Sequence, residues 1–364
     1  MKLTCLLFPL LFLSCTQKEV AHGDQAKSTE QNCFILNEGV NLDETPKPVR
    51  VPTCAEVLKN LPAHIGLLER SDYEPFDYDL ERSETQQEEE KNYFESTEYQ
   101  KKYADWIIAL PEFNYVSLQD QYALAKNKYG YWIIEKTNGS LKPYFLGLTQ
   151  NIYLPDFYRR DFNFIDGGVI TLKAAVVNVT RLSRVPMLPK YEILRDRIEV
   201  RLKLDDIKRD TDQDGFNDLF ETFVGLNPKS ADTDGDGIND FKDPNPKYQA
   251  GKDQFTGMYE MLVDHGKAAH YSFVEILTNC DYFQRINPKN IKVLMYTTAE
   301  QAPIKEDVLD LFFPGKYSKM KTYKNYEKVY FTDFSDQSGH GTISAELIKG
   351  RWKFDKKYTL TFGM

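Results

Sequence analysis

The chain has 364 residues, a formal net charge of −9 and a pI near 5.3. This acidity argues against nucleic acid as a partner, because phosphate recognition needs clustered positive charge. Hydrophobic residues make up 41% of the chain, including 23 Phe, 23 Tyr and 3 Trp, so there is enough apolar surface for sizeable cores. A chain of this length exceeds one ordinary domain and predicts two or three.

The first 15 residues resemble a bacterial lipoprotein signal peptide. Lys2 is followed by the apolar run Leu3–Leu13, which is too short to span a bilayer as a mature helix, and Cys15 follows the small residue Ser14. The resemblance implies cleavage before Cys15, which would become the lipid-modified N-terminus. An ordinary signal peptide with an incidental Cys is the alternative, and either one exports the protein. We expect an outer-membrane lipoprotein of the cell envelope, with residues 16–50 as a flexible polar tether.

Residues 51–204 are predicted to form an N-terminal α+β domain. Apolar spacing predicts helices over Cys54–Glu69, where Pro62 could kink or split the helix, and over Glu81–Leu110. The pattern then changes to alternation with turn signals, and Asn138-Gly139 is a strong hairpin signal. The predicted strands lie within Tyr115–Lys136, Leu141–Thr149, Gly168–Leu182 and Asp196–Leu204. We expect these strands to form an antiparallel sheet.

The segment 205–247 contains two copies of one acidic pattern, Asp-x-Asp-x-Asp-Gly-x-x-Asp with another acid three residues later. The first copy has Gly215 at its sixth position, Phe216 at its seventh, and the acids Asp210, Asp212, Asp214, Asp218 and Glu221. The second copy has Gly237 and Ile238 at these positions, and the acids Asp232, Asp234, Asp236, Asp240 and Asp243. Between the two copies we expect a short helix that ends at Gly225 as its C-cap, before Pro228.

This spacing is typical of a calcium loop. Calcium takes about six to eight oxygen ligands, which the alternating carboxylates supply while the sixth-position glycine allows a sharp turn. The seventh residue would give its backbone carbonyl, the ninth would act through a water, and the twelfth, Glu221 or Asp243, would close the shell. A solvated acidic linker is the alternative, but a linker needs neither the repeated glycine nor the apolar residue after it. We expect about two calcium ions, and local unfolding without them.

The same residues resemble bacterial thrombospondin type 3-like calcium-binding repeats, which are EF-hand-like. The match covers about 40 residues and says nothing of the flanking regions. It places the side-chain ligands at Asp210, Asp212, Asp214 and Glu221, and at Asp232, Asp234, Asp236 and Asp243. Gln213 departs from the usual glycine, which is harmless if its side chain points outward. The resemblance implies a calcium-stiffened spacer between domains, as in adhesins and envelope proteins.

Residues 248–364 are predicted to form a second α+β domain, which resembles no family by its motifs. The predicted helices are Gln254–Val263, Tyr271–Leu277 and Glu306–Phe313. The predicted strands are Asn290–Thr298, Lys328–Phe334, Thr342–Lys349 and Trp352–Phe362, with a hairpin turn at 349–351. The complete fold expected is therefore α+β, with two small antiparallel-sheet domains joined by a calcium-binding connector.

The cysteines after Cys15 are Cys33, Cys54 and Cys280. Cys33 and Cys54 are close enough in sequence to form a disulfide in an oxidising compartment. Cys280 lies in a mixed setting that favours a buried free thiol. Sequence alone does not determine the pairing.

Catalytic patterns are weak by comparison with the acidic repeats. Gly339-His340-Gly341-Thr342 matches the string around the catalytic His of subtilisin-like proteases, but no matching Ser context follows it. We therefore favour a non-enzymatic, calcium-binding envelope lipoprotein that acts in binding, adhesion or scaffolding, with a cell-surface protein or glycan as partner. The alternative is an extracellular polymer-acting hydrolase with structural calcium, because paired carboxylates of that kind meet only in the fold.

Overall fold

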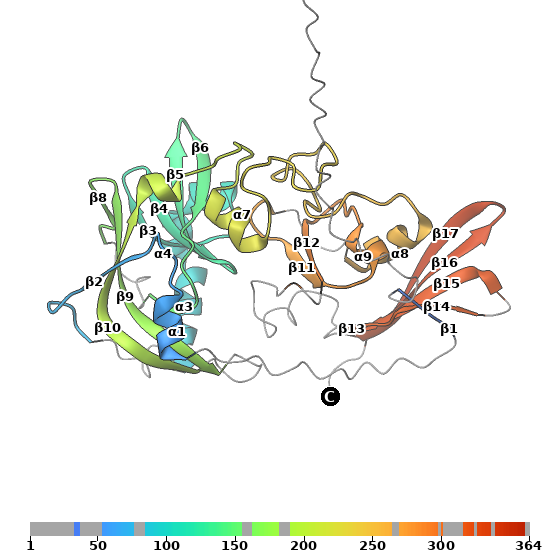
Figure 1. Ribbon diagram of the computed structural model, residues 1–364, viewed down its shortest axis with the longest axis horizontal. Coiled ribbons are helices and arrows are strands. Elements are labelled where there is room, and N and C mark those ends of the chain that lie inside the picture. The colour runs from blue at the N-terminus through green and yellow to red at the C-terminus, as the bar shows by residue number, and fades with distance from the viewer. Residues whose placement is uncertain are drawn as a thin grey trace, which may run out of the picture.

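The computed structural model describes residues 33–36, 53–75, 84–154, 162–181, 190–263, 269–297, 300, 316–323, 326–335 and 339–360. The chain is mixed α and β with mostly antiparallel sheets, as the predicted α+β class requires. Two sheets lie at one end of the long axis and a larger sheet lies at the other (Figure 1). Between them lie helix α7 (Asp218–Val224) and the paired strands β11 (Val274–Leu277) and β12 (Val293–Tyr296). None of the helices within the described ranges is both long and apolar enough to cross a membrane.

The first sheet is an antiparallel meander of four consecutive strands. They are β3 (Asn114–Gln119), β4 (Tyr122–Asn127), β5 (Gly130–Thr137) and β6 (Ser140–Phe145). The β5–β6 turn is Asn138-Gly139, with φ of 52° and 82°. Positive φ at both residues matches the right-handed twist of the strands, so the predicted hairpin is confirmed.

A second sheet packs against the first. Its strand order is β2-β10-β9-β7, with β8 on β9. The strands are β2 (Gly66–Glu69), β7 (Ile152–Tyr153), β8 (Ile165–Asp166), β9 (Val169–Arg181) and β10 (Lys190–Lys203). Leu124 and Ile133 of the first sheet share a core with Ile170 and Val200 of the second. The hydrophobic effect of this shared core holds the two sheets together.

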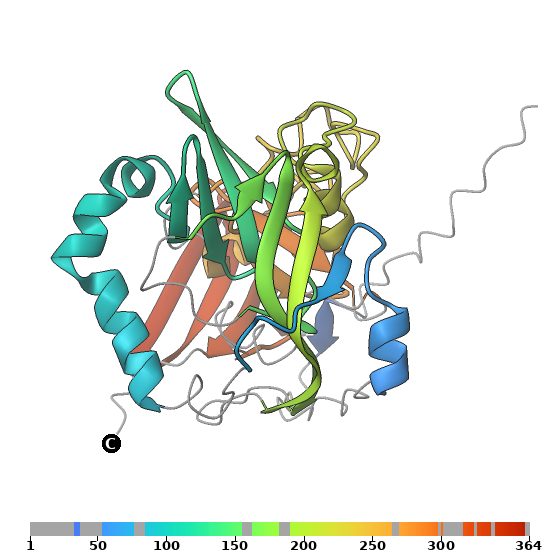
Figure 2. The ribbon, with the colours of Figure 1, turned by 90° about the vertical axis from the view of Figure 1, so that its left-hand side faces the viewer.

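Both helices predicted near the N-terminus are shorter than expected. Helix α1 (Cys54–Lys59) ends before Pro62, and β2 occupies the last four residues of the predicted helix. Thr53 begins α1 with a capping box to Glu56. The second predicted helix, Glu81–Leu110, is divided into three: α3 (Glu84–Glu95), α4 (Thr97–Lys102) and α5 (Ala104–Ala109). Together they form a bent arm along one side of the molecule, drawn in cyan in Figure 2. Ser96 breaks the arm because its side chain accepts a hydrogen bond from the Tyr99 N–H and starts a new helix.

The C-terminal sheet has the order β1-β14-β15-β16-β17, with β13 on β15. Its strands are β1 (Phe34–Leu36), β13 (Lys316–Tyr317), β14 (Met320–Tyr323), β15 (Tyr326–Ser335), β16 (Gly339–Ile348) and β17 (Arg351–Leu360). Helices α8 (Gln254–Val263) and α9 (Asp281–Gln284) share its apolar core, which includes Met258, Phe283 and Ile343. The predicted helix α8 and the predicted final strands are present.

One predicted helix is wrong. Part of Tyr271–Leu277 forms strand β11 (Val274–Leu277), which pairs in parallel with β12 (Val293–Tyr296). The two middle residues of β11, Glu275 and Ile276, are both buried, so the strand shows no strict alternation and apolar spacing alone does not separate helix from strand here. The predicted helix Glu306–Phe313 lies outside the described residues.

The predicted cysteine pairing is also wrong. Cys33 is bonded to Cys280, with a Cα–Cα distance of 4.9 Å and a sequence separation of 247. The adjacent strand β1 pairs in parallel with β14, so residues within the predicted tether belong to the C-terminal sheet. Proximity in sequence favoured Cys54, but the pairing follows the fold rather than the loop length. Cys280 is therefore buried, as predicted, but it is not a free thiol.

An aromatic core joins the three predicted regions of the chain. Trp132 of β5, Phe220 of α7 and Tyr271 belong to one buried cluster. Trp132 lies 4.9 Å from the Phe220 ring and 5.5 Å from the Tyr271 ring, measured between centroids. The repeat segment thus contributes side chains to the interior, unlike a free-standing spacer. The domain boundaries at 204 and 247 stay a prediction.

Candidate metal centre

Both acidic loops turn as the pattern predicts. The sixth-position residues Gly215 and Gly237 have φ of 119° and 94°, which a side chain would resist. The fourth position is also left-handed, with φ of 63° at Gln213 and 76° at Gly235. Gln213 is exposed, so its side chain does point outward, but its backbone adopts the conformation for which glycine is the usual residue.

Carboxylates at the third and fifth positions shape each loop from inside. The Asp212 carboxylate accepts a hydrogen bond from the Asp214 N–H at 3.2 Å, and Asp214 accepts one from the Phe216 N–H at 2.7 Å. The second loop repeats both bonds from the N–H groups of Asp236 and Ile238. These bonds draw the carboxylates inward, so the two loops share one local geometry.

The ninth-position acids brace the loops. Asp218 accepts hydrogen bonds from the Thr211 N–H and hydroxyl, both at 2.7 Å. Asp240 accepts the equivalent bonds from Thr233 at 2.8 and 2.6 Å. Both oxygens of each carboxylate therefore hold the start of the loop to its end, a role that the calcium-loop template did not predict for these positions.

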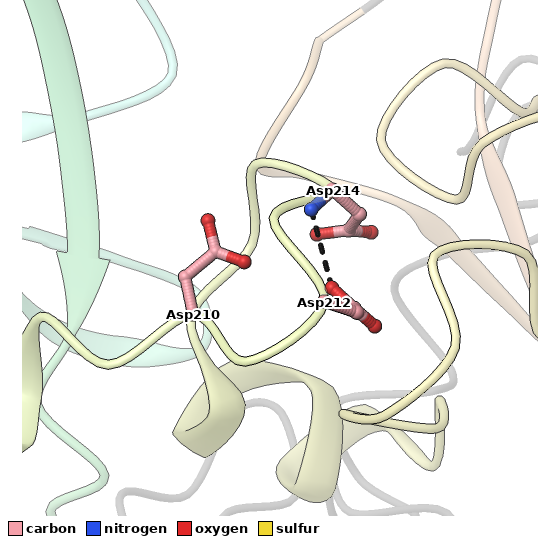
Figure 3. A group of neighbouring side chains, drawn as sticks. All are labelled: Asp210, Asp212 and Asp214. Carbon is pink, nitrogen blue, oxygen red and sulfur yellow. Dashed lines mark hydrogen bonds between the residues drawn. The ribbon is translucent and has the colours of Figure 1, made fainter.

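The first group of candidate ligands is Asp210, Asp212 and Asp214 (Figure 3). Each offers a carboxylate oxygen, and these oxygens lie within 4.8 Å of one another. One buried oxygen on each residue has no hydrogen-bond partner: Asp210 Oδ1, Asp212 Oδ2 and Asp214 Oδ2. The Lys142 ammonium lies 3.1 Å from the other oxygen of Asp210. The orphaned oxygens match the donor set that a hard cation requires.

Glu221 of helix α7 (Asp218–Val224) belongs to a second group, which shares Asp214 with the first. Its side chain is 0% exposed, and neither Oε1 nor Oε2 has a hydrogen-bond partner. One of its oxygens lies within 4.8 Å of carboxylate oxygens of Asp214 and Asp240. Burying a carboxylate without a partner is costly, and native structures rarely leave one so. Because Asp240 comes from the second loop, the two loops meet at this point.

The second loop gathers Asp232, Asp234 and Asp236, again within 4.8 Å. Asp232 accepts hydrogen bonds from the N–H groups of Gly235 and Gly237, both at 2.8 Å. Asp234 Oδ2 is buried and has no partner. The predicted closing residue Asp243 is 4% exposed, and its Oδ2 likewise lacks a partner.

The two predicted carbonyl ligands lie in different surroundings. The Phe216 side chain is 1% exposed, and the centroid of its ring lies 5.1 Å from that of the Phe220 ring. The Ile238 side chain is 38% exposed. The seventh residue of the first loop therefore packs in the core, whereas the seventh residue of the second loop is exposed to solvent.

Burial and mutual repulsion raise the pKa of several of these carboxyl groups, among them those of Asp214, Glu221, Asp234 and Asp243. Burial, followed by the charges of Asp212 and Asp214, raises the pKa of Glu221 to about 9. Burial is also the main cause that raises the pKa of Asp214 and Asp234 to about 7 and that of Asp243 to about 6. Without a cation, the surroundings of these four side chains favour their protonated form.

Two buried amides that the motif did not single out fix the repeat segment to its flanks. Asn217 donates to the carbonyls of Phe145 and Ile207, at 2.9 and 2.8 Å, and accepts from the Phe145 N–H. Asn245 donates to the carbonyls of Gln284 and Ile286 at 2.6 and 2.9 Å. The sequence offered a signal for both residues. Asn217 directly follows the seventh position of the first loop, and Asn245 belongs to the Asn-Pro pair that ends the second repeat.

Lys292, just before β12, was also missed. Its ammonium donates to the Phe241 carbonyl and lies 5.2–5.6 Å from the centroids of three rings, those of Phe216, Phe241 and Phe273. Burial lowers its pKa to about 8, against the charges of Asp243, Asp214 and Asp240. A lysine distant in sequence thus supplies positive charge beneath both loops, which no local pattern could reveal.

The chain matches no protein-family model, no curated protein and no solved structure.

Proposed function

We propose that residues 205–247 bind about two calcium ions and that calcium joins the regions on either side of them. The observation that supports this most is Glu221, a fully buried carboxylate with both oxygens unpartnered beside Asp214 and Asp240. Asp210, Asp212, Asp214 and Glu221 would hold one ion. Asp232, Asp234, Asp236 and Asp243 would hold the other.

The donor set favours calcium over other metals. Every member of the three acidic groups is a carboxylate, which suits a hard cation and not zinc or copper, for which sulfur and imidazole ligands are usual. Magnesium demands near-ideal octahedral geometry and keeps much of its water. The repeated flexible loops with many carboxylates suit the larger and less demanding ion.

Calcium would act on the aromatic core. Phe220, in the helix after the first loop, packs against Trp132 and Phe273, which come from the two flanking regions. Phe216, in the first loop, packs against Tyr271. Without the ion, clustered carboxylates repel one another and weaken the segment that presents these rings. Calcium would therefore fix how residues 51–204 and 248–364 are joined, which suits a role in binding, adhesion or scaffolding.

We further propose that the protein is a lipoprotein of the outer membrane, anchored through Cys15, whose partner is a cell-surface protein or glycan. Cys15 lies outside the described residues. The Cys33–Cys280 disulfide supports export, because disulfides persist in oxidising compartments. A polymer-acting hydrolase with structural calcium is the other prediction, and the same loops would serve it.

Calorimetry and limited proteolysis of the chain from residue 16 test the calcium proposal. We expect about two calcium ions per chain, and protection of residues 205–247 in calcium but not in EDTA. Magnesium at the same concentration is the matched control. If calcium produces neither heat nor protection, the segment is an acidic linker and the proposal fails.

A further inference from the structure

The ninth-position acids of the two loops have the same local role but different surroundings. Asp218 accepts hydrogen bonds from the Thr211 N–H and hydroxyl, and Asp240 accepts the equivalent bonds from Thr233. Asp218 is partly exposed, whereas Asp240 is 0% exposed. Bracing a loop therefore does not require a buried acid at this position. Because burying a carboxylate is costly, we expect Asp240 to have a second role.

Asp240 lies at the junction of the two loops. One of its carboxylate oxygens lies within 4.8 Å of carboxylate oxygens of Asp214 and Glu221, which belong to the first repeat. All three side chains are buried. Asp218, the equivalent acid of the first loop, belongs to none of the three acidic groups formed by the described residues. The ninth-position acid of the second loop thus approaches ligands of the first loop, in addition to bracing its own.

The acids at this junction have acceptor capacity to spare. Neither oxygen of the fully buried Glu221 has a hydrogen-bond partner, and Asp214 Oδ2 is also buried without one. Each Asp240 oxygen accepts one hydrogen bond and keeps a second lone pair. The buried Lys292 ammonium, whose charge acts on Asp214 and Asp240, donates to the Phe241 carbonyl instead. Three buried carboxylates directed at one another in this way suit a hard cation.

A single ion can bind both the first loop and Asp240. Two oxygens on one calcium ion are at most about 4.6–5.2 Å apart, which is twice the calcium–oxygen distance. The separations at the junction, all within 4.8 Å, satisfy this limit. Asp214 belongs to the first-loop group and also to the group with Glu221 and Asp240. Its Oδ1 accepts a hydrogen bond from the Phe216 N–H, so its free Oδ2 favours one shared ion over a separate ion between the loops.

We propose that Asp240 of the second loop is a ligand of the calcium ion in the first loop, so that the two ions bind cooperatively. Thr233 fixes the Asp240 carboxylate to the start of the second loop. An ion that orders the second loop therefore also places Asp240 against the first ion, and by reciprocity the first ion favours the second. The cooperativity rests on the proposed function, because it requires calcium in both loops.

The coupling between the two ions can be measured without assigning each binding step to a loop. Asp210→Asn with Asp212→Asn leaves only the site of the second loop, and Asp232→Asn with Asp234→Asn leaves only that of the first. For coupled ions, the product of the two calcium association constants of the intact chain from residue 16 exceeds the product of the two single-site constants. Calorimetry measures all four constants, and we expect a ratio of about ten.

Asp240→Asn tests the ligand, and Asp218→Asn is its matched control. Asparagine can keep the brace, because its carbonyl oxygen accepts from the threonine N–H and its amide donates to the threonine hydroxyl, but the charge is lost. With the four constants measured again in each background, Asp240→Asn should reduce the ratio to about one. Asp218→Asn should leave the ratio near its wild-type value, although Asp218 belongs to the first loop itself.

A second pair of variants keeps every carboxylate. Thr233→Val removes the hydroxyl that holds Asp240 to the second loop, so it should lower the ratio. Thr211→Val makes the same change beside Asp218 and should not lower it. This pair decides the question if Asp240→Asn does not fold.

The possible results separate the cooperativity from the proposed function. Two ions bound with a ratio near one, or a ratio that does not fall in folded Asp240→Asn or in Thr233→Val, would overturn only the cooperativity. Three ions in the wild-type chain and two in Asp240→Asn would also overturn it, because the junction would then hold an ion of its own. A wild-type chain that binds no calcium would overturn the proposed function and the cooperativity together.

Discussion

The two acidic loops have one backbone design but lie in different surroundings. In both, the third- and fifth-position carboxylates accept backbone hydrogen bonds and the ninth-position acid binds a threonine. The first loop places Phe216 and Glu221 in the interior, whereas the second leaves Ile238 exposed. The hydrogen bonds that shape a loop are thus independent of whether its seventh residue is buried. A repeated motif can have one backbone geometry at two places and bury its seventh-position side chain at only one of them.

The seventh position gives the largest contrast. Phe216→Ala should lower the free energy of unfolding by about 3–5 kcal/mol, because it leaves a cavity among buried rings. Ile238→Ala, at the equivalent exposed position, should cost less than about 1 kcal/mol. Denaturant unfolding in calcium measures both values. Equal costs would show that the two loops have the same structural role.

The closing position tests the ions one at a time. Glu221→Gln should reduce calcium stoichiometry from about two to about one and lower stability by about 3 kcal/mol when free calcium is about 100 times Kd. Asp243→Asn is the matched variant and should spare binding at the first loop. Calorimetry gives the stoichiometry and thermal unfolding gives the stability. Retention of both ions in Glu221→Gln would remove this residue from the site.

The pH dependence of the calcium-free protein should also distinguish the loops. The folded-state pKa of Glu221 is raised from 4.5 to about 9, so its contribution to stability is complete below pH 4.5 and is lost as the pH rises through about 9. For Asp243, raised from 3.8 to about 6, the loss ends near pH 6. Thermal unfolding in EDTA should therefore show stability still falling above pH 7, and Glu221→Gln should flatten that fall.

The fourth position gives the smallest effect. Gln213 has φ of 63° where the second loop has Gly235, so Gln213→Gly should stabilise the protein by about 1 kcal/mol. Gly235→Gln should destabilise it by about the same amount. Because both sites are exposed, packing contributes little, and opposite shifts in Tm are the expected signature. Shifts of the same sign would contradict the comparison.

Local signals in the sequence predicted local structure well. The Asn138-Gly139 hairpin, the C-cap at Gly225 (φ 79°) and the turns at Gly215 and Gly237 are all present, because each depends on a few adjacent residues. The convergence of most of the predicted acidic ligands likewise follows from the loop pattern.

Features set by distant residues could not be predicted in this way. Lys292 lies beneath the loops because β12 brings it there, and Cys33 meets Cys280 because β1 joins the C-terminal sheet. The strand at Val274–Leu277 depends on a parallel partner elsewhere in the chain. Tertiary pairing decides each case, and it leaves no periodic mark in the local sequence.

The Cys33–Cys280 bond also turns most of the polypeptide into a covalent ring. The two cysteines are 247 positions apart in the sequence, so the ring includes the first two sheets and both acidic loops, while β17 lies outside it. Loop-closure entropy alone gives such a ring an advantage of about 5 kcal/mol over the open chain. Synthesis proceeds from the N-terminus, so Cys33 and the nearer Cys54 both emerge long before Cys280. The correct ring can close only after Cys280 has been synthesised, so β1 takes its place in the C-terminal sheet only after all the residues between the two cysteines have been made.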